Sequence, residues 1–536
     1  MKRDAWRGFV FGVYALLMLT VTLIVVFAYR FVDFYMKEDM GGYLLSNEAL
    51  ALLGIGLCGL GVWSVRKAGT ARVERVFARA GWRLVAVLSV LTLVMQVMVC
   101  YHAHYTTRWD AQSVIDSAYA FARGEYEYFF TEYFSRCQNN ITLMALYGYI
   151  LRAVMALTHT EPGLERFMVL LIIMQSVISV SVGVMIWRLT RDLLRERGRT
   201  PYMGALAAWL LYFVLLGCSP WFLIPYSDST ALWIPVLSIL IYMRKGSRHG
   251  VPEGLALGLL GGLAFNLKPQ TMIPVIAIAL NEGAKAVRER RWKRPLAYLC
   301  MLLVGAAVVV GPVKGMIVDS IDVELNQNHK LGLVHYFRMG LNEERTGMWE
   351  GRDDELMEFE TNEERNAYEL QLALDRIQAF GITGLARHSV KKCLANFSDG
   401  SFSARTKTFR SLAEEKDPVL TPLIRNIFFG EGEYFPVLHT LQQGAWLLVL
   451  ILCASGVLVY RRMIGDGGDG LSVMMLSTVG IICFNMLFEA GARYVFVMVP
   501  VMIVLAVVTL QAVVSKGLSM RRKKSAPRAE DAAAVD

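Results

Sequence analysis

Residues 104–142 read HYTTRWDAQSVIDSAYAFARGEYEYFFTEYFSRCQNNIT, and this polar, aromatic stretch decides how the rest of the chain is arranged. An apolar segment at about 82–101 ends just before it, and another at about 141–157 starts at its close. A loop rich in carboxylates between two such segments is either a water-filled mouth or a site. The remainder of the sequence favours a site.

The composition excludes a soluble protein. Apolar residues make up 55% of the chain and charged residues only 19%, and the mean hydropathy is +0.42. The apolar runs are long and uninterrupted, whereas a bilayer requires roughly 20 apolar residues per helical span and a membrane barrel requires alternation. We therefore predict an all-α polytopic membrane protein with about 12–13 transmembrane helices.

The candidate spans are about residues 8–30, 48–66, 82–102, 141–157, 166–187, 202–218, 228–243, 253–267, 270–282, 296–317, 441–461, 471–488 and 493–515. Basic loops at 66–83, 188–199, 244–249, 285–294 and 460–462, with the tail at 521–524, indicate the cytoplasmic side, so both termini are expected there in a multi-pass cell-membrane protein. With 103–140 outside and 188–199 inside, two full spans between them give the wrong sidedness, so either 141–157 is a short or dipping helix or one basic loop lies outside. We keep the positive-inside assignment and favour a 141–157 helix that does not fully span. The net charge of +9 follows from these loops and does not indicate a nucleic-acid partner.

Five regions follow from this pattern: an N-terminal hairpin and basic loop (1–81), a membrane module with a catalytic outer loop at 103–140 (82–317), an extracytoplasmic insert (318–440), C-terminal helices (441–515) and a disordered tail (516–536). The outer loop is expected to form interfacial helices. The acidic stretch at 343–378 is typical of a helix within the insert. The scattered cysteines are expected to pack between helices.

Asp110 directly follows a predicted span, so its carboxylate is placed to act as a general base toward an acceptor hydroxyl. The alternative is a helix cap. Arg108 and Asp116 flank it as candidate substrate contacts, and the aromatic run EYEYFFTEYF (125–134) would anchor the loop at the interface or provide a platform for a sugar ring.

Further candidate substrate contacts lie at the other predicted outer turns. Asn139 and Asn140 start an apolar segment, as do Tyr226 and Asp228 in PYSDS, and capping is the alternative for each. Asn342 in RMGLN is a weaker candidate.

Two basic residues are candidates for binding a phosphate. Lys268 lies at a helix break made by Pro269, where a lone ammonium would require an anion; snorkelling is the alternative. Arg493 ends a span four residues after Glu489, so the two could form an ion pair one helical turn apart. We predict that Glu489 and Tyr494 also contact the substrate.

The motifs WDAQ, QNNI, PYSDS, LKPQ, RMGLN and FEAGARYVFVMVP, in this order between about 82 and 515, resemble the GT-C superfamily of glycosyltransferases that use polyprenyl-phosphate sugars, such as protein O-mannosyltransferases and lipid A aminoarabinose transferases. The resemblance implies a catalytic aspartate at Asp110 and basic residues holding the lipid phosphate at Lys268 and Arg493. Two features depart from it: Cys137-Gln138 stands where an aromatic-Pro pair is usual, and an extra apolar pair precedes the module.

The sequence thus predicts an inverting hexosyltransferase that acts on an extracytoplasmic glycan, lipid or protein acceptor. No cofactor is required by these residues, although Asp110, Asp116 and Asp228 could bind a divalent cation. A transporter or flippase for lipid-linked saccharides is the alternative from another class, and a glycan polymerase or ligase is a closer one.

Overall fold

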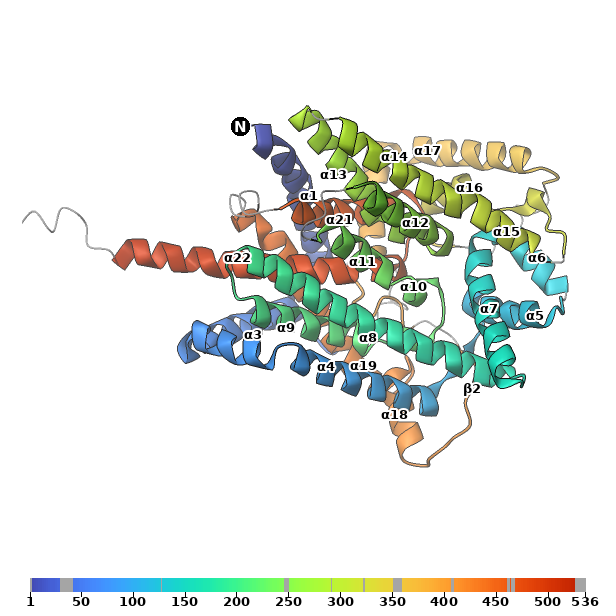
Figure 1. The fold of residues 1–536 in the computed structure, drawn as a ribbon, viewed down its shortest axis with the longest axis horizontal. Coiled ribbons are helices and arrows are strands. Elements are labelled where there is room, and N and C mark those ends of the chain that lie inside the picture. The colour runs from blue at the N-terminus through green and yellow to red at the C-terminus, as the bar shows by residue number, and fades with distance from the viewer. Residues whose placement is uncertain are drawn as a thin grey trace, which may run out of the picture.

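The computed structural model describes residues 2–28, 42–126, 128–244, 250–290, 292–321, 323–349, 359–405, 409–459, 463 and 468–525. The described chain is a helical bundle with one small two-stranded sheet (Figure 1). The described residues of the predicted apolar segments are mostly helical, which confirms the all-α polytopic class.

Among the described residues, nine helices are long and apolar enough to cross a membrane. They contain α1 (Lys2–Phe27), α3 (Asn47–Ala68), α4 (Thr70–Ala103), α7 (Ile141–Thr158), α8 (Leu164–Glu196), α14 (Lys293–Val308), α19 (Phe435–Ala454), α21 (Asp469–Leu487) and α22 (Val499–Ser525). Three shorter apolar stretches are Pro201–Gly217, which begins with α9 (Pro201–Tyr212), Ser227–Tyr242, which contains the short polar α10 (Ser227–Thr230) and the apolar α11 (Trp233–Tyr242), and α12 (Val251–Leu267). Helix α13 (Ile273–Glu289) is apolar in its first half only.

The remaining elements are mostly polar or short: β1 (Tyr105–Thr107), α5 (Asp110–Arg123), α6 (Tyr128–Arg136), α15 (Lys314–Asp319), α16 (Leu333–Gly340), α17 (Asn362–Phe397), β2 (Phe409–Leu412) and α18 (Leu420–Phe428). Single turns η2 (Gln138–Asn140), η4 (Pro220–Leu223), η5 (Pro269–Met272), η7 (Gln327–His329), η9 (Ser455–Val459), η10 (Ala492–Tyr494) and η11 (Phe496–Met498) and two π-helical turns, η3 (Phe213–Gly217) and η6 (Val309–Val313), interrupt the helices. Most of these irregular turns lie at helix ends.

The bundle has two different ends. We call the end that carries α5, α6, α16 and the two strands the polar end, and the opposite end, with the basic loops 66–83, 188–199 and 285–294, the basic end (Figure 1). At the basic end the Glu74 carboxylate accepts hydrogen bonds from the backbone amides of Tyr202 and Met203 at 2.8 and 3.0 Å, and Arg66 donates to the carbonyl of Val514. The start of α1 and the end of α22 both lie there.

The direction of α7 bears on whether the loops before and after it lie at the same end of the bundle. Figure 1 shows it running across the direction shared by α4 and α8. His104, just after α4, contacts Glu165, at the start of α8, at 3.0 Å, so the chain leaves and re-enters the bundle at the same end. The guanidinium of Arg152 in α7 donates to the carbonyl of Phe121 in α5 at 2.6 Å, which holds α7 against the polar layer. This arrangement fits the interpretation of 141–157 as a helix that does not cross.

The outer loop and the insert form one cap at the polar end. Strands β1 and β2 pair antiparallel, with Tyr105 opposite Leu412. Next to the sheet, His102 Nδ1 lies 2.8 Å from the hydroxyl of Thr421, and Arg425 donates to the His102 carbonyl. Because these bonds join residues more than three hundred positions apart, the two segments fix each other's position.

Helices α12 and α14 pack backbone to backbone. A Cβ atom added to Gly305 would lie 2.7 Å from the carbonyl oxygen of Leu255, so the glycine allows the two axes to approach. Small residues at such crossings are how helices associate where lipid removes the hydrophobic driving force. This packing fixes the end of α12, which carries Lys268.

Two expectations about local structure need correction. Residues 343–349 form turns rather than a helix, while 350–358 lie outside the described residues and the helix begins only with α17. The tail is helical as far as Ser525 because α22 continues beyond 516, whereas 526–536 lie outside the described residues.

Candidate functional site

The candidate site lies where several helices are interrupted at the polar end. Helix α12 ends at Leu267 before Pro269, and α21 ends at Leu487 before an extended segment. Tyr226 precedes the short α10, and Asp110 starts α5. Interrupted backbone at membrane depth is tolerated only where protein or a watery cavity satisfies it, so these breaks mark functional positions.

Asp110 is the first residue of α5, and its carboxylate does not cap the helix. The N-cap is Trp109, and no side-chain cap bond forms there. Within the described chain, no hydrogen bond or ion pair engages the Asp110 side chain. The capping alternative is therefore wrong, and a partly exposed carboxylate remains available to a ligand.

Tyrosine hydroxyls surround Asp110. The pKa of Tyr133 is raised well above its usual value by burial, by Tyr226 and by the charge of Asp110. The pKa of Tyr336 is likewise raised, first by burial and further by the charges of Glu489 and Asp110, among others. Asp110 therefore lies close enough to residues of two different segments, α6 and α16, to affect their ionisation, and their neutral hydroxyls can donate hydrogen bonds.

Lys268 is not a lone ammonium. Its Nζ donates to Oδ1 of Asp228, which is fully buried, and lies 5.1 Å from the centre of the Tyr494 ring. The second carboxylate oxygen of Asp228 has no hydrogen-bond partner. Both snorkelling and capping fail as explanations, since the two residues satisfy each other inside the protein. The charge of Lys268 is therefore already matched by Asp228 within the protein itself.

Arg493 and Glu489 do not pair directly across one helical turn. Residues 488–491 are not helical, and Gly491 has a φ of 160°. The Tyr494 hydroxyl instead links the two: Arg493 Nη2 donates to it at 2.8 Å, and it donates to the Glu489 carboxylate. The predicted ion pair is thus replaced by a phenol bridge, because the helix ends before Glu489.

The guanidinium of Arg493 is held by aromatic faces. Its Cζ lies 5.5 Å from the Trp109 ring and 4.8 Å from the Tyr494 ring. Trp109 itself meets Tyr226 edge-on at 5.0 Å and Trp221 at 6.3 Å. Stacking positions a guanidinium while leaving its N–H donors at the edge for an anion, which a lysine could not do. Within the described part, only the bond to Tyr494 uses those donors.

Asn140 ties the outer loop to this aromatic group. It occupies the N-cap position of α7 without capping it; its amide donates to the hydroxyls of Tyr133 at 2.7 Å and Tyr226 at 3.3 Å. Asn139 is exposed, and its amide contacts only the Asn140 side chain, at 3.4 Å. The structure therefore places Asn140 in the site and Asn139 at its edge.

Three predicted residues lie outside the group around Asp110. Arg108 is exposed. Asp116 lies more than one helical turn along α5 and accepts a bond of 2.7 Å from Gln112. Asn342 is buried beneath the site, where its backbone carbonyl accepts from Gly347, whose own carbonyl accepts from Ala490. Through Gly347, Asn342 therefore supports the segment that carries Glu489 and Arg493.

The sequence did not single out Lys392 of α17, which supports that same segment. Its Nζ donates to the carbonyls of Gly340 at 2.9 Å, Met486 at 3.0 Å and Phe488 at 2.6 Å. Burial lowers the pKa of Lys392 to about 7, although the charge of Glu489 opposes the shift. No local pattern reveals this role, because its three acceptors are backbone atoms distant in sequence.

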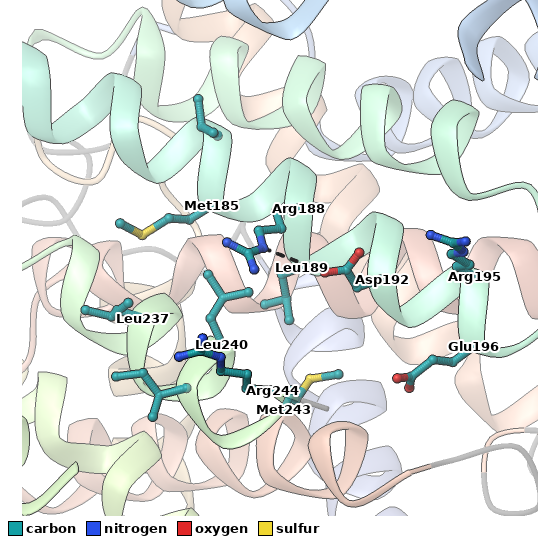
Figure 2. A pocket seen from close by; sticks show the side chains of 12 residues that line it. Met185, Arg188, Leu189, Asp192, Arg195, Glu196, Leu237, Leu240, Met243 and Arg244 are labelled. Atoms are coloured by element: carbon teal, nitrogen blue, oxygen red, sulfur yellow. Dashed lines mark ion pairs between the residues drawn. The ribbon is translucent and has the colours of Figure 1, made fainter. Parts of the chain in front are cut away.

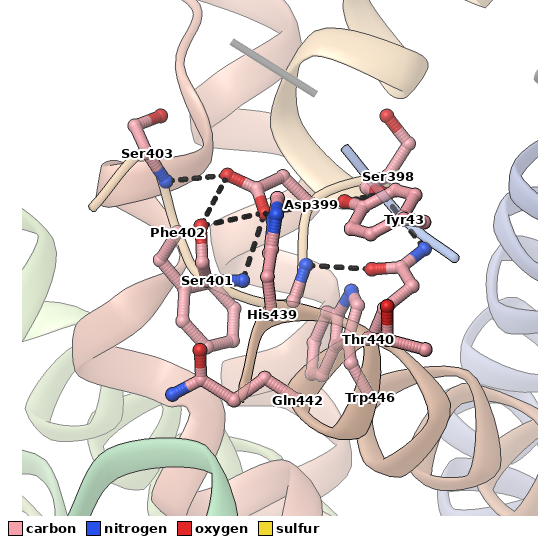
Figure 3. Close-up of polar contacts among 12 residues, drawn as sticks. Tyr43, Ser398, Asp399, Ser401, Phe402, Ser403, His439, Thr440, Gln442 and Trp446 are labelled. Carbon is pink, nitrogen blue, oxygen red and sulfur yellow. Dashed lines mark hydrogen bonds and ion pairs between the residues drawn. The ribbon is translucent and has the colours of Figure 1, made fainter. Parts of the chain in front are cut away.

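A second polar cluster surrounds Asp399 and contains both a histidine and serines (Figure 3). The Asp399 carboxylate accepts from Ser401 N at 2.8 Å, Ser403 N at 2.6 Å and His439 Nε2 at 3.0 Å. Burial alone would raise the pKa of Asp399, but the bonds from His439 and the serine amides lower it overall. The Ser401 hydroxyl bonds the carboxylate rather than the imidazole, and all three side chains are at most 1% exposed. The cluster fastens the insert to α19 and is not a nucleophilic site.

In the described part of the chain, no group of three or more His, Cys, Asp or Glu residues is arranged to hold a metal ion. Two of the three suggested ligands are already engaged by other side chains: Asp228 accepts from Lys268, and Asp116 accepts from Gln112. The suggestion that these three could share a cation is therefore not supported by their placement.

The fold and site define a polytopic helical membrane protein with a charged, aromatic site at one end of its bundle. The chain belongs to the family described as "conserved hypothetical integral membrane protein", which matches residues 5–514. A comparison with curated proteins gave no match.

Proposed function

We propose that this protein is an integral membrane glycosyltransferase that transfers a hexose from a polyprenyl-phosphate donor to an acceptor outside the cytoplasm. The observation that carries the proposal is that an unengaged carboxylate, Asp110, and an arginine with spare donors, Arg493, belong to one aromatic-lined group. The GT-C resemblance supports the same two roles. We assign the basic end to the cytoplasm by the positive-inside rule.

In the proposed reaction, Asp110 accepts the proton of the acceptor hydroxyl as its oxygen attacks the anomeric carbon. The bond from that carbon to the phosphate oxygen breaks, and the polyprenyl phosphate leaves with an additional negative charge. Arg493 stabilises this charge. A single displacement inverts the anomeric centre; of the described carboxylates near Asp110, Glu489 accepts from Tyr494 and Asp228 from Lys268, so we assign neither as a nucleophile.

Lys268 has a smaller role here than the sequence predicts. Its charge is matched by Asp228, so the phosphate is held chiefly by Arg493, and Lys268 keeps the helix break in shape. Trp109 and Tyr226 provide aromatic edges and faces against which a sugar ring can pack.

The test is transfer of radiolabelled sugar from a polyprenyl-phosphate donor in membranes, comparing wild type with Asp110→Asn. The amide keeps the shape and removes the base, so transfer should fall about 10²-fold or more at equal expression. Asp375→Asn, an exposed carboxylate of α17 at the polar end, is the matched control and should retain activity. Equal transfer by Asp110→Asn and wild type would remove Asp110 from catalysis.

The flippase alternative draws support from the interrupted segments at 213–230 and 487–498, which are typical of transporters. In that case neither the wild type nor Asp110→Asn would transfer sugar, and labelled donor would cross the membrane instead. A polymerase or ligase would give transfer to a growing glycan, with the same dependence on Asp110.

A further inference from the structure

A groove lies between α8 and α11 (Figure 2), toward the basic end and away from α5, which stands at the polar end of the bundle (Figure 1). Its volume is about 970 Å³. Its lining includes Met185, Arg188, Leu189, Leu237, Leu240 and Arg244. None of these residues takes part in the proposed reaction.

The walls of the groove are apolar and continue onto the outer surface of α8. Met185 and Leu189 from α8 face Leu237 and Leu240 from α11. Val184 is 39% exposed, and Val177, seven residues earlier on the same face, is 49% exposed. An apolar groove continuous with the lipid-facing surface of a spanning helix is suited to an acyl chain.

The mouth of the groove carries a net positive charge, because three arginines stand against the carboxylates of Asp192 and Glu196. Arg188 and Arg244 project from the two walls, and Arg195 lies toward the end of α8 (Figure 2). The Asp192 carboxylate is already neutralised by Arg191, whose Nη2 lies at 2.7 Å, whereas Arg188 approaches it only to 3.8 Å and is 64% exposed. Arg188 therefore keeps most of its capacity to bind an anion.

We propose that this groove binds an anionic glycerophospholipid from the adjacent leaflet, with its phosphate at Arg188 and Arg244 and an acyl chain along the apolar walls. Guanidinium groups bind phosphate oxygens in a bidentate manner, and basic side chains between spanning helices at the cytoplasmic surface attract anionic headgroups. A free phosphate would gain nothing from the apolar walls. A zwitterionic headgroup would bring a cation close to the arginines.

The experiment measures lipid binding by native mass spectrometry of the delipidated full-length protein, titrated with phosphatidylglycerol or phosphatidylcholine. Phosphatidylglycerol should bind the wild type more tightly. Arg188→Gln/Arg244→Gln should weaken its binding about tenfold or more. Arg72→Gln/Arg79→Gln, which removes the same charge from exposed positions of α4 at the same end, should change binding less than about twofold.

A second variant tests the apolar walls of the groove independently of its charges. Leu240→Trp fills the groove without altering charge and should also reduce phosphatidylglycerol binding. Equal binding of the two lipids, equal loss in the control pair, or unchanged binding by Leu240→Trp would each overturn the proposal. Displacement of the lipid by millimolar inorganic phosphate would overturn it in favour of a simple anion site.

Discussion

Replacing Lys268 by Met should destabilise the protein strongly, because the buried carboxylate of Asp228 loses the ammonium that pairs with it. The Asp228 side chain is fully buried, and its Oδ2 already lacks a partner, so the bond from Lys268 is its main compensation. Removing one partner of such a pair costs about 3–5 kcal/mol, whereas replacing both with apolar groups of similar volume is often neutral. Lys268→Met should therefore be much less stable than Lys268→Met/Asp228→Leu.

The assay is thermal unfolding of the purified protein in detergent, followed by the loss of the monodisperse peak in size-exclusion chromatography. The control is Lys416→Met, whose ammonium lies 3.5 Å from the exposed carboxylate of Glu414 and should contribute about 1 kcal/mol or less. A double variant as unstable as Lys268→Met would refute the reasoning. If the double variant is stable, its sugar transfer shows whether Lys268 also touches the substrate.

Three further results are expected. Arg493→Lys keeps the charge but loses the planar contact with Trp109, so sugar transfer should fall about tenfold or more with unchanged unfolding temperature; unchanged transfer would contradict the stacked guanidinium. Gly340→Ala should destabilise the protein by about 1–3 kcal/mol in the same unfolding assay, because the new Cβ would lie 2.6 Å from the Leu487 carbonyl oxygen. Lys392 has a pKa of about 7 when folded and 10.5 when unfolded, so the unfolded state binds more protons between these values and this residue makes stability rise with pH above about 7. Lys392→Met should flatten that rise in unfolding temperatures measured from pH 6 to 9, and an identical slope would contradict the shifted pKa.

The sequence predicts the helices well because apolar length is a local property. It also predicts that Asp110, Asp228 and Arg493 lie at the same end, because positively charged loops assign each turn to a side. It cannot predict that Lys268 meets Asp228, since the contact joins residues 40 positions apart through two helix breaks. The Glu489–Arg493 spacing suggests a helical pair, but the backbone at Gly491 is not helical.

The supporting residues are hidden from the sequence for a different reason. Lys392 acts on backbone carbonyls, which every residue has, so no motif marks its partners. Trp109 stands beside Asp110 in the sequence, but no local pattern predicts that its ring contacts the guanidinium of Arg493. Side chains that hold other groups in place are recognisable only once those groups have been placed.

The pairing of β1 with β2 has a consequence for the order of synthesis. Tyr105 meets Leu412, so the segment next to Asp110 has no strand partner until more than three hundred further residues have been translated. Arg493 follows later still. A ribosome-bound chain therefore leaves the β1 segment unpaired for most of its synthesis, although α5 can already pack on α7, and the charged group closes only near the end. Truncations before residue 412 should accumulate with an unpaired, protease-sensitive β1 segment, whatever number of helices they have already inserted.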